Sequence, residues 1–238
     1  MIGCKCPVCS SNNPKNNRTR SSVILEVDGI HILIDTTPEM RIQCIREQVD
    51  RVNAILFTHA HADHMFGLDD IRRFNKISGT TMLCYGLAST FESMHQAFGY
   101  AFRPHKQVAG GIPSISPIEV DGQFDVLGIH VTPVPILHGR LSILGYRIGD
   151  LAYITDCSSI PESSLKLLRN LDTLVLGVIR HEPHPTHFTV SQGIEVVKQL
   201  QPKRTYFTHI AHQLEHEETN RILPSGICLA YDGLQVML

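Results

Sequence analysis

The sequence of 238 residues contains no tryptophan, no apolar run near the ~20 residues of a membrane span, and no large excess of either charge. Its first residues, Met1-Ile2-Gly3-Cys4, lack the charged and apolar regions of a signal peptide. A net charge of -2 provides no basic field that would attract extended nucleic acid or an anionic membrane. We therefore expect a cytoplasmic protein with neither a membrane nor extended nucleic acid as its partner.

Hydrophobic residues make up 42% of the chain, which is enough for one large core, and we expect a single domain over residues 1–238. There is no repeat of fixed period and no low-complexity tract. The cysteines number seven, and three of them, Cys4, Cys6 and Cys9, lie close together. An odd number with this clustering favours metal binding over a disulfide framework.

Strand and helix patterns alternate along the rest of the chain. Asp28-Gly29, between residues 23–27 and 30–34, predicts a hairpin. Helical spacing follows over residues 38–48, with these expected buried positions: Met40, Ile42, Cys44 and Ile45. Further strands are expected at 52–57, 82–85, 129–135, 141–148, 151–155, 173–178, 205–208, 227–231 and 234–238, and further helices at 67–74, 87–97, 161–171 and 189–200. This mixture predicts an α/β sandwich.

Four metal-binding side chains directly follow the apolar run at residues 52–57: His59, His61, Asp63 and His64. A strand that ends in a loop can direct several ligands at one point, and imidazole with carboxylate suits zinc, manganese or iron. Three isolated ligands also end predicted strands: His138, Asp156 and His209. The repeated pattern predicts a metal site at the strand ends.

These motifs resemble those of the metallo-β-lactamase superfamily over essentially the whole chain. The resemblance implies a four-layer αβ/βα sandwich with a dinuclear metal site at one edge. It also implies the ligands, which are His59, His61 and His138 for one ion, Asp63, His64 and His209 for the other, and Asp156 as the bridge. Two such cations lower the pKa of a shared water, so the expected nucleophile is the hydroxide that bridges them.

Two positions narrow the chemistry within the superfamily. Position 61 is histidine where the oxygen-reducing diiron branch has a carboxylate, which favours hydrolysis over redox chemistry. Asp156 differs from the cysteine that antibiotic hydrolases place in the second site. Cys157 is adjacent, but a shift of one residue along a strand turns a side chain to the other face. We therefore expect a hydrolase in which Asp156 is the ligand.

A second metal site is expected near the N-terminus. Cys4, Cys6 and Cys9 offer three thiolates in six residues, and a closed tetrahedral zinc site needs a fourth ligand. His212, three residues after His209, is the expected fourth ligand. This zinc would be structural, since four protein ligands leave no position open for water; the alternative is an exposed thiol cluster in a reducing compartment.

The cysteine motif, residues 180–189 and residues 208–213 together resemble one branch of the superfamily, the phosphoribosyl 1,2-cyclic phosphodiesterases. That resemblance implies hydrolysis of a small phosphodiester, such as a cyclic ribose phosphate or a nucleotide, at a manganese or zinc pair, with a structural zinc and a homodimer. Family members usually have a strand and a Gly-rich loop before the segment that is Ile2-Gly3-Cys4 here. The first strand of the fold is therefore expected to be missing. Either the sequence is truncated, in which case the neighbouring strand would have an exposed edge, or the protein lacks one outer strand.

Asp63 and His187 are the expected catalytic residues, with His187 as the protonated group at the leaving oxygen. His187 precedes a predicted helix at Thr189, where amide groups can hold a phosphate; the alternative is that it caps or packs against that helix. His184 and His181 are further candidates for substrate contacts. Asp35 either orients the ligand loop or only makes a turn. The remaining histidines are interpreted as surface or packing residues: His31, His95, His105, His130 and His216.

Three other functions fit parts of this pattern. A ribonuclease resembling transfer-RNA 3′ processing enzymes shares the ligand set and a His-x-Thr-like motif at residues 187–189, but no basic, Gly-rich arm is inserted here. A thioester hydrolase of the glyoxalase type also uses an aspartate bridge, but the chain has no C-terminal helical extension for a glutathione-like tail. A non-enzymatic, zinc-stabilised binding module predicts zinc on the cysteines without a second metal pair.

Overall fold

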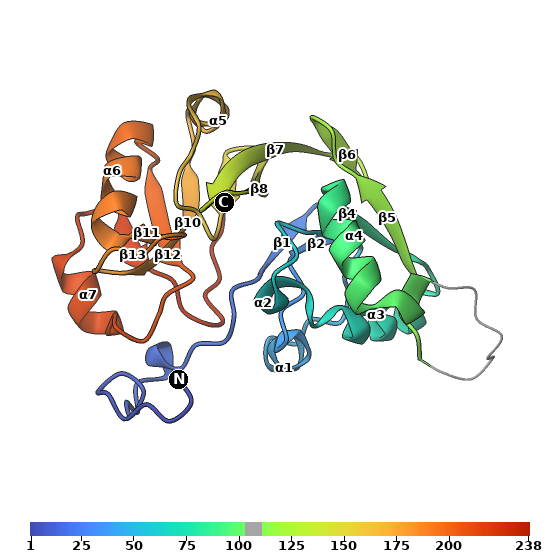
Figure 1. The fold of residues 1–238 in the computed structure, drawn as a ribbon, viewed down its shortest axis with the longest axis horizontal. Helices are drawn as coiled ribbons and strands as arrows, with labels where there is room; N and C mark the ends of the chain where they lie inside the picture. Colours follow the sequence, from blue (N-terminus) through green and yellow to red (C-terminus); the bar gives the residue numbers. More distant parts are fainter. Residues whose placement is uncertain (103–110) are drawn as a thin grey trace. The chain divides into compact units, whose positions relative to one another are not determined.

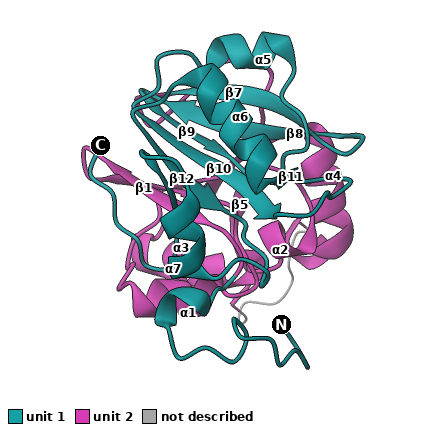
Figure 2. Ribbon diagram, turned by 90° about the vertical axis from the view of Figure 1, so that its left-hand side faces the viewer, with its two compact units in different colours: residues 1–19, 131–238 teal, residues 20–130 magenta. Residues whose placement is uncertain are grey.

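The computed structural model describes residues 1–102 and 111–238, which pack as two compact units (Figure 2). Unit 1 contains residues 1–19 and 131–238, and unit 2 contains residues 20–130. Each unit has its own cluster of buried hydrophobic residues, which pack between its sheet and its helices. That both units belong to one domain stays a prediction. Among the described residues, no helix has the length and apolar character needed to span a membrane.

Unit 2 contains a five-stranded sheet in the order β1-β2-β3-β4-β5. The strands β1 and β2 form an antiparallel hairpin, and the pairs from β2 to β5 are parallel. The strands are β1 (Val23–Val27), β2 (Ile30–Ile34), β3 (Ala54–Leu56), β4 (Met82–Gly86) and β5 (Ile115–Glu119), followed by β6 (Phe124–Val126). The helices are α1 (Met40–Arg46), α2 (Ala62–Met65), α3 (Arg72–Ser78) and α4 (Ala88–Ala97), with 3-10 turns η2 (Leu68–Ile71) and η3 (Gly99–Phe102).

Unit 1 contains a mixed sheet with the strand order β13-β12-β10-β9-β8-β7, and β11 pairs with β10. Several of these strands are labelled in Figure 1. Its strands are β7 (Ile129–His138), β8 (Leu141–Ile148), β9 (Leu151–Ile154), β10 (Thr173–Arg180), β11 (Phe188–Thr189), β12 (Arg204–Thr208) and β13 (Ile227–Leu229). Its helices are α5 (Glu162–Leu167), α6 (Val190–Leu200) and α7 (His216–Ile222), with the 3-10 turn η1 (Pro14–Asn16). Thr189 caps α6 through a capping box with Gln192, as the sequence predicts.

The strand directions in unit 1 bring three predicted metal ligands to one edge of the sheet. The strands β9, β10 and β12 are parallel, and β7 runs the same way as β9 because both are antiparallel to β8. His138 is the last residue of β7, Asp156 is the second residue after β9, and His209 directly follows β12. Because parallel strands end at the same edge, the strand order itself gathers these side chains.

Most predicted strands are present, and four predictions of local structure are wrong. Residues 234–238 do not form a strand, β3 covers only residues 54–56, and a 3-10 turn followed by α3 replaces the helix predicted at 67–74. Ile42 and Ile45 are 62% and 69% exposed, whereas Met40 is buried. Met40 and Cys44 lie one turn apart and pack on the core, but positions two and five residues after Met40 face elsewhere on a helix.

Candidate metal centre

In unit 2, the loop after β3 gathers the histidines of the His-x-His-x-Asp-His motif. The rings of His59 and His61 lie 4.5 Å apart, and those of His59 and His64 lie 4.3 Å apart. His59 and His64 are buried, and His61 is exposed at the start of α2. Asp63 is half-buried, with Oδ2 3.4 Å from Nε2 of His64. The loop after β3 and the short helix α2 that follows it therefore bring these side chains close together.

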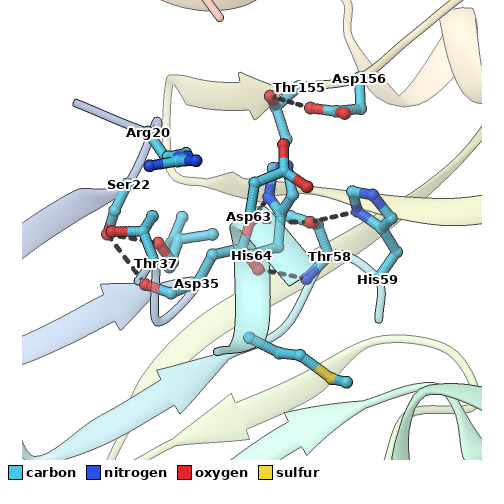
Figure 3. A network of polar contacts seen from close by, with 12 residues as sticks. Arg20, Ser22, Asp35, Thr37, Thr58, His59, Asp63, His64, Thr155 and Asp156 are labelled. Carbon is cyan, nitrogen blue, oxygen red and sulfur yellow. Dashed lines mark hydrogen bonds and ion pairs between the residues drawn. The ribbon is translucent and has the colours of Figure 1, made fainter. Parts of the chain in front are cut away.

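Asp35 forms hydrogen bonds with this loop, as expected if it orients the ligands rather than only making a turn (Figure 3). It lies at the end of β2 with no exposed surface. Its Oδ1 accepts the backbone N–H of Thr58 at 2.8 Å. Its Oδ2 lies 2.8 Å from both the Thr58 hydroxyl and Nδ1 of His64. Burial raises the pKa of Asp35, and the His64 ring and the Thr58 donors act against that shift.

These contacts select one tautomer for two of the histidines. Because the Asp35 carboxylate accepts, Nδ1 of His64 carries the proton and its Nε2 keeps the lone pair. The single hydroxyl proton of Thr58 points at Asp35, so its oxygen accepts from Nδ1 of His59, 3.0 Å away. His59 therefore also presents Nε2 as a ligand atom. The fixed orientation suits metal binding, for which the neutral ring must offer a lone pair.

The loop also needs a glycine at position 67. The Gly67 N–H donates to the Thr36 carbonyl at 2.9 Å, and the Thr36 N–H donates to the His64 carbonyl at 2.7 Å. A Cβ at Gly67 would lie 2.1 Å from the Thr37 carbonyl oxygen, which is closer than any side chain allows. The close approach of two backbone segments thus holds α2 against the loop after β2.

In unit 1, the three strand-end ligands have matching support. The Thr186 carbonyl lies 2.9 Å from Nδ1 of His138. Because a carbonyl only accepts, Nδ1 carries the proton and Nε2 keeps the lone pair. Asp156 is buried, and its Oδ1 accepts the Thr155 hydroxyl at 2.7 Å (Figure 3). Nε2 of His209 lies 3.3 Å from the same oxygen. This part of the sheet edge therefore offers two imidazoles and a carboxylate.

His187 lies among these ligands rather than on the outer surface. Its ring is 4.7 Å from that of His138 and stacks on that of His209 at 4.9 Å. His184 is 4.8 Å from His187 and accepts the Thr186 N–H at 3.3 Å. Burial lowers the pKa of His187 to about 4 and lowers that of His184. His181 is exposed just beyond β10.

The three N-terminal cysteines and His212 also meet within unit 1, with ligand atoms that all lie within 4.8 Å of one another. Nδ1 of His212 is 3.5 Å from Sγ of Cys4 and 3.4 Å from Sγ of Cys6. The backbone N–H of Cys9 lowers the pKa of Cys6 to about 6, and His212 adds to that shift. Three thiols and one imidazole at these separations fit a tetrahedral zinc ion.

Other candidate residues have ordinary structural surroundings. Cys157 is buried in the core of unit 1, and burial raises its pKa to about 12, so it is not placed as a ligand. Of the five histidines interpreted as surface or packing residues, His216 is buried against the Tyr231 ring and His130 is exposed beside Asp125. His31 lies near the Arg51 carbonyl, and His95 packs on the Phe102 ring. His105 lies outside the described residues.

Residues 31–210 match the family model described as the beta-lactamase superfamily domain. The chain belongs to this family. A crystal structure of a diphosphatase from the PhnP family is 44% identical, with a TM-score of 0.92, and the match covers 100% of this chain and 91% of that one. Zn(2+)-bound PqqB from Methylobacterium extorquens shares the fold at 20% identity and a TM-score of 0.79, covering 100% of this chain and 95% of its own.

A curated relative is much longer than this chain. The protein named octanoyltransferase from Porphyromonas gingivalis (strain ATCC BAA-308 / W83) is 33% identical over 240 residues, which are 100% of this chain and 48% of that protein. The chain thus spans about half the length of this curated relative. The family match and the 44% identity to the PhnP-family structure make this chain a PhnP-like member of the superfamily, and its His and Asp groups imply divalent metal ions.

Proposed function

We propose that the protein hydrolyses a phosphorus–oxygen bond in a small phosphoric diester with the help of two divalent ions. One observation carries the proposal. In His59, His64 and His138 a hydrogen bond at Nδ1 fixes the tautomer, so that Nε2 keeps a lone pair for a metal ion. The phosphorus chemistry is supported by the 44% identical diphosphatase. That activity belongs to the relative, so it guides only the choice of substrate class.

The proposed ligands follow the resemblance to the superfamily. One ion would be bound by His59, His61 and His138, the other by Asp63, His64 and His209, and Asp156 would bridge them. The supporting contacts within the units are the paired rings after β3 and the Asp156–His209 contact of 3.3 Å. Zinc and manganese both suit such nitrogen and oxygen ligands. The fourth position at the three cysteines is proposed for His212, with zinc as its structural ion.

In the reaction, water adds to phosphorus, the bond to the leaving oxygen breaks, and that oxygen gains a proton. Two divalent ions, when bound, lower the pKa of a shared water and stabilise charge on the phosphoryl oxygens. Asp63, besides being a metal ligand, would orient the attacking water toward the phosphorus. His187 would face the leaving oxygen, where the phosphate's negative charge favours the protonated ring.

The low pKa of His187 sets a condition on that role. With a pKa of about 4, its ring is neutral at pH 7 and donates a hydrogen bond rather than a full proton. A neighbouring anion raises the pKa of an imidazole, so a bound phosphate would make His187 a better acid. His184, adjacent to His187, and His181, beyond β10, are proposed to contact the phosphate or the sugar.

A second candidate is hydrolysis of a diphosphate bridge in a small molecule, which is favoured because the 44% identical relative is a diphosphatase. The same groups would act, because a diphosphate bridge also presents a phosphorus, a leaving oxygen and developing negative charge. A ribonuclease, a glyoxalase-type thioester hydrolase and a zinc-stabilised binding module remain the other hypotheses. The name octanoyltransferase carries no argument here, since the chain matches 48% of that protein. A homodimer and a cytoplasmic location stay predictions.

One substrate panel separates these hypotheses. Manganese-loaded protein would be incubated with bis(p-nitrophenyl) phosphate, a ribose 1,2-cyclic phosphate, a dinucleoside diphosphate, a thioester and a small RNA. We expect turnover of a diester or the diphosphate, abolished in His138→Ala. His130→Ala is the matched control, because His130 is an exposed histidine on the same strand. Turnover of only the thioester or RNA, or of nothing, would overturn the proposal.

A further inference from the structure

The segment after the cysteines packs along the loop that follows His209. Asn16 donates from Nδ2 to the Glu215 carboxylate at 2.6 Å and accepts the His216 N–H at 2.9 Å. Thr19 donates its N–H and its hydroxyl to Asp232 at 3.0 and 2.6 Å. Two parts of the chain that are distant in sequence are therefore joined by side-chain hydrogen bonds within unit 1.

Arg18 is the centre of this contact. Its Nη1 donates to the Ala211 carbonyl at 3.2 Å, and its Nη2 donates to the Leu214 carbonyl at 2.8 Å. The side chain is half-buried, and burial lowers its pKa although Glu215 and Asp232 act the other way. Its planar guanidinium thus spans two backbone carbonyls on one loop. Lysine cannot reproduce that geometry, because its single ammonium group has no planar fork.

The loop that Arg18 holds begins at His209. His209 has a left-handed backbone with φ of 55°, so the chain turns sharply between β12 and this loop. From the other side, Ala211 donates its N–H to the Ile179 carbonyl at 2.9 Å. His212, one residue further, lies at the cysteines. The backbone that carries the His209 ring is therefore fixed by β12 before it and by Arg18, Ile179 and the cysteine site after it.

We propose that Arg18 is a positioning residue for His209 and thereby strengthens binding of the metal ion that His209 holds. The inference rests on the proposed function, in which His209 is a ligand of one of two ions. A ligand ring on a loose loop must be ordered when the ion binds, and that ordering weakens affinity. Residues that hold a metal ligand in place typically contribute 10- to 100-fold to metal affinity.

The test compares Arg18→Gln with Arg147→Gln. Arg147 is a matched control, because it too donates to backbone carbonyls: from Nη1 to Leu167 at 2.7 Å and Arg169 at 2.8 Å, and from Nε to Gly149 at 2.8 Å. It lies in the same unit at the opposite end of β8 from Leu141, the residue that pairs with His138. Both changes remove one charge and hydrogen bonds to backbone carbonyls, two at Arg18 and three at Arg147, but only the first touches the His209 loop.

Two quantities would be measured in each purified variant with its cysteine zinc retained. The first is amide hydrogen exchange over residues 209–214, and the second is the affinity for each Mn²⁺ ion in a titration. For Arg18→Gln we expect exchange at least tenfold faster there and one Mn²⁺ dissociation constant raised about tenfold, with the other within twofold. Arg147→Gln should change neither quantity, and Arg18→Lys should recover part of the loss.

Two outcomes would overturn the inference. One is that Arg18→Gln matches Arg147→Gln within twofold in both quantities. The other is an equal loss of affinity for both ions together with lower global stability, in Arg18→Gln and Arg18→Lys alike, which is what a purely structural role predicts. Failure of the proposed function would be a distinct result, because wild-type protein would then bind no Mn²⁺ pair or hydrolyse no phosphoric ester. The hydrogen-exchange comparison would still show whether Arg18 orders residues 209–214.

Discussion

Replacing Asp35 with asparagine should weaken metal binding strongly without a change of fold. The carboxylate accepts three donors: the Thr58 N–H and hydroxyl and Nδ1 of His64. An amide of the same shape has one accepting oxygen. If that oxygen faces the Thr58 N–H, the NH₂ group meets Nδ1 of His64 and favours the tautomer with a proton on Nε2, so Nε2 has no lone pair for a metal. If the amide is reversed, the buried Thr58 N–H loses its acceptor.

The size of the effect follows from these two arrangements. Without metal the variant can adopt the first arrangement, whereas a metal on Nε2 of His64 requires the second. The second leaves the buried Thr58 N–H unsatisfied, which costs about 1–3 kcal/mol. Since about 1.4 kcal/mol is a tenfold change in an equilibrium constant, the metal dissociation constant should rise about 5- to 150-fold. The loss of negative charge behind His64 acts in the same direction, because it makes the ring a weaker base.

The assay is a competition titration of Mn²⁺ against a chelator, with circular dichroism to check the fold. Asp125→Asn is the matched control, because Asp125 faces His130 at 3.4 Å but is 71% exposed. We expect Asp125→Asn to bind metal like the wild-type protein. A folded Asp35→Asn variant whose dissociation constants stay within twofold of wild type would refute the reasoning.

Three further predictions concern single side chains. His187→Ala should lower kcat about 100-fold for a diester with an alkyl leaving group but only a few-fold for a nitrophenyl one, and equal losses would contradict an acid role. Cys6→Ser should remove one zinc ion per chain by elemental analysis, whereas Cys44→Ser should keep it. Gly193→Ala should lower the free energy of unfolding in urea by about 1–3 kcal/mol, because its Cβ would lie 2.5 Å from Cγ1 of Val178, and unchanged stability would contradict this packing.

Local patterns in the sequence predict the parts of the site that lie close together along the chain. The three histidines of the motif gather in one loop because a strand followed by a short helix brings nearby residues together. His212 was predicted from the need for a fourth zinc ligand, and the structure brings it to the cysteines. The Asp28-Gly29 hairpin forms with the predicted strand bounds. Such features depend on few long-range contacts.

The supporting contacts could not be predicted, because they depend on tertiary structure or on backbone atoms. Thr186 orients His138 through its carbonyl, a group that every residue has, so its side chain gives no signal. Arg18 stands in a polar segment that reads as an ordinary loop, and its role emerges only when residues 211–214 lie beside it. Ile42 had the right polarity for the core but lies on the wrong face of α1.

The central claim is that two divalent ions together drive hydrolysis of a phosphoric ester. Its most direct test is a Mn²⁺ titration of protein that retains its cysteine zinc but has been stripped of other metals, with turnover of bis(p-nitrophenyl) phosphate and a dinucleoside diphosphate followed throughout. We predict that turnover of at least one substrate rises until two equivalents of Mn²⁺ are bound and disappears with a chelator. Binding of two equivalents without turnover of either substrate, or turnover that survives the chelator, would contradict the claim.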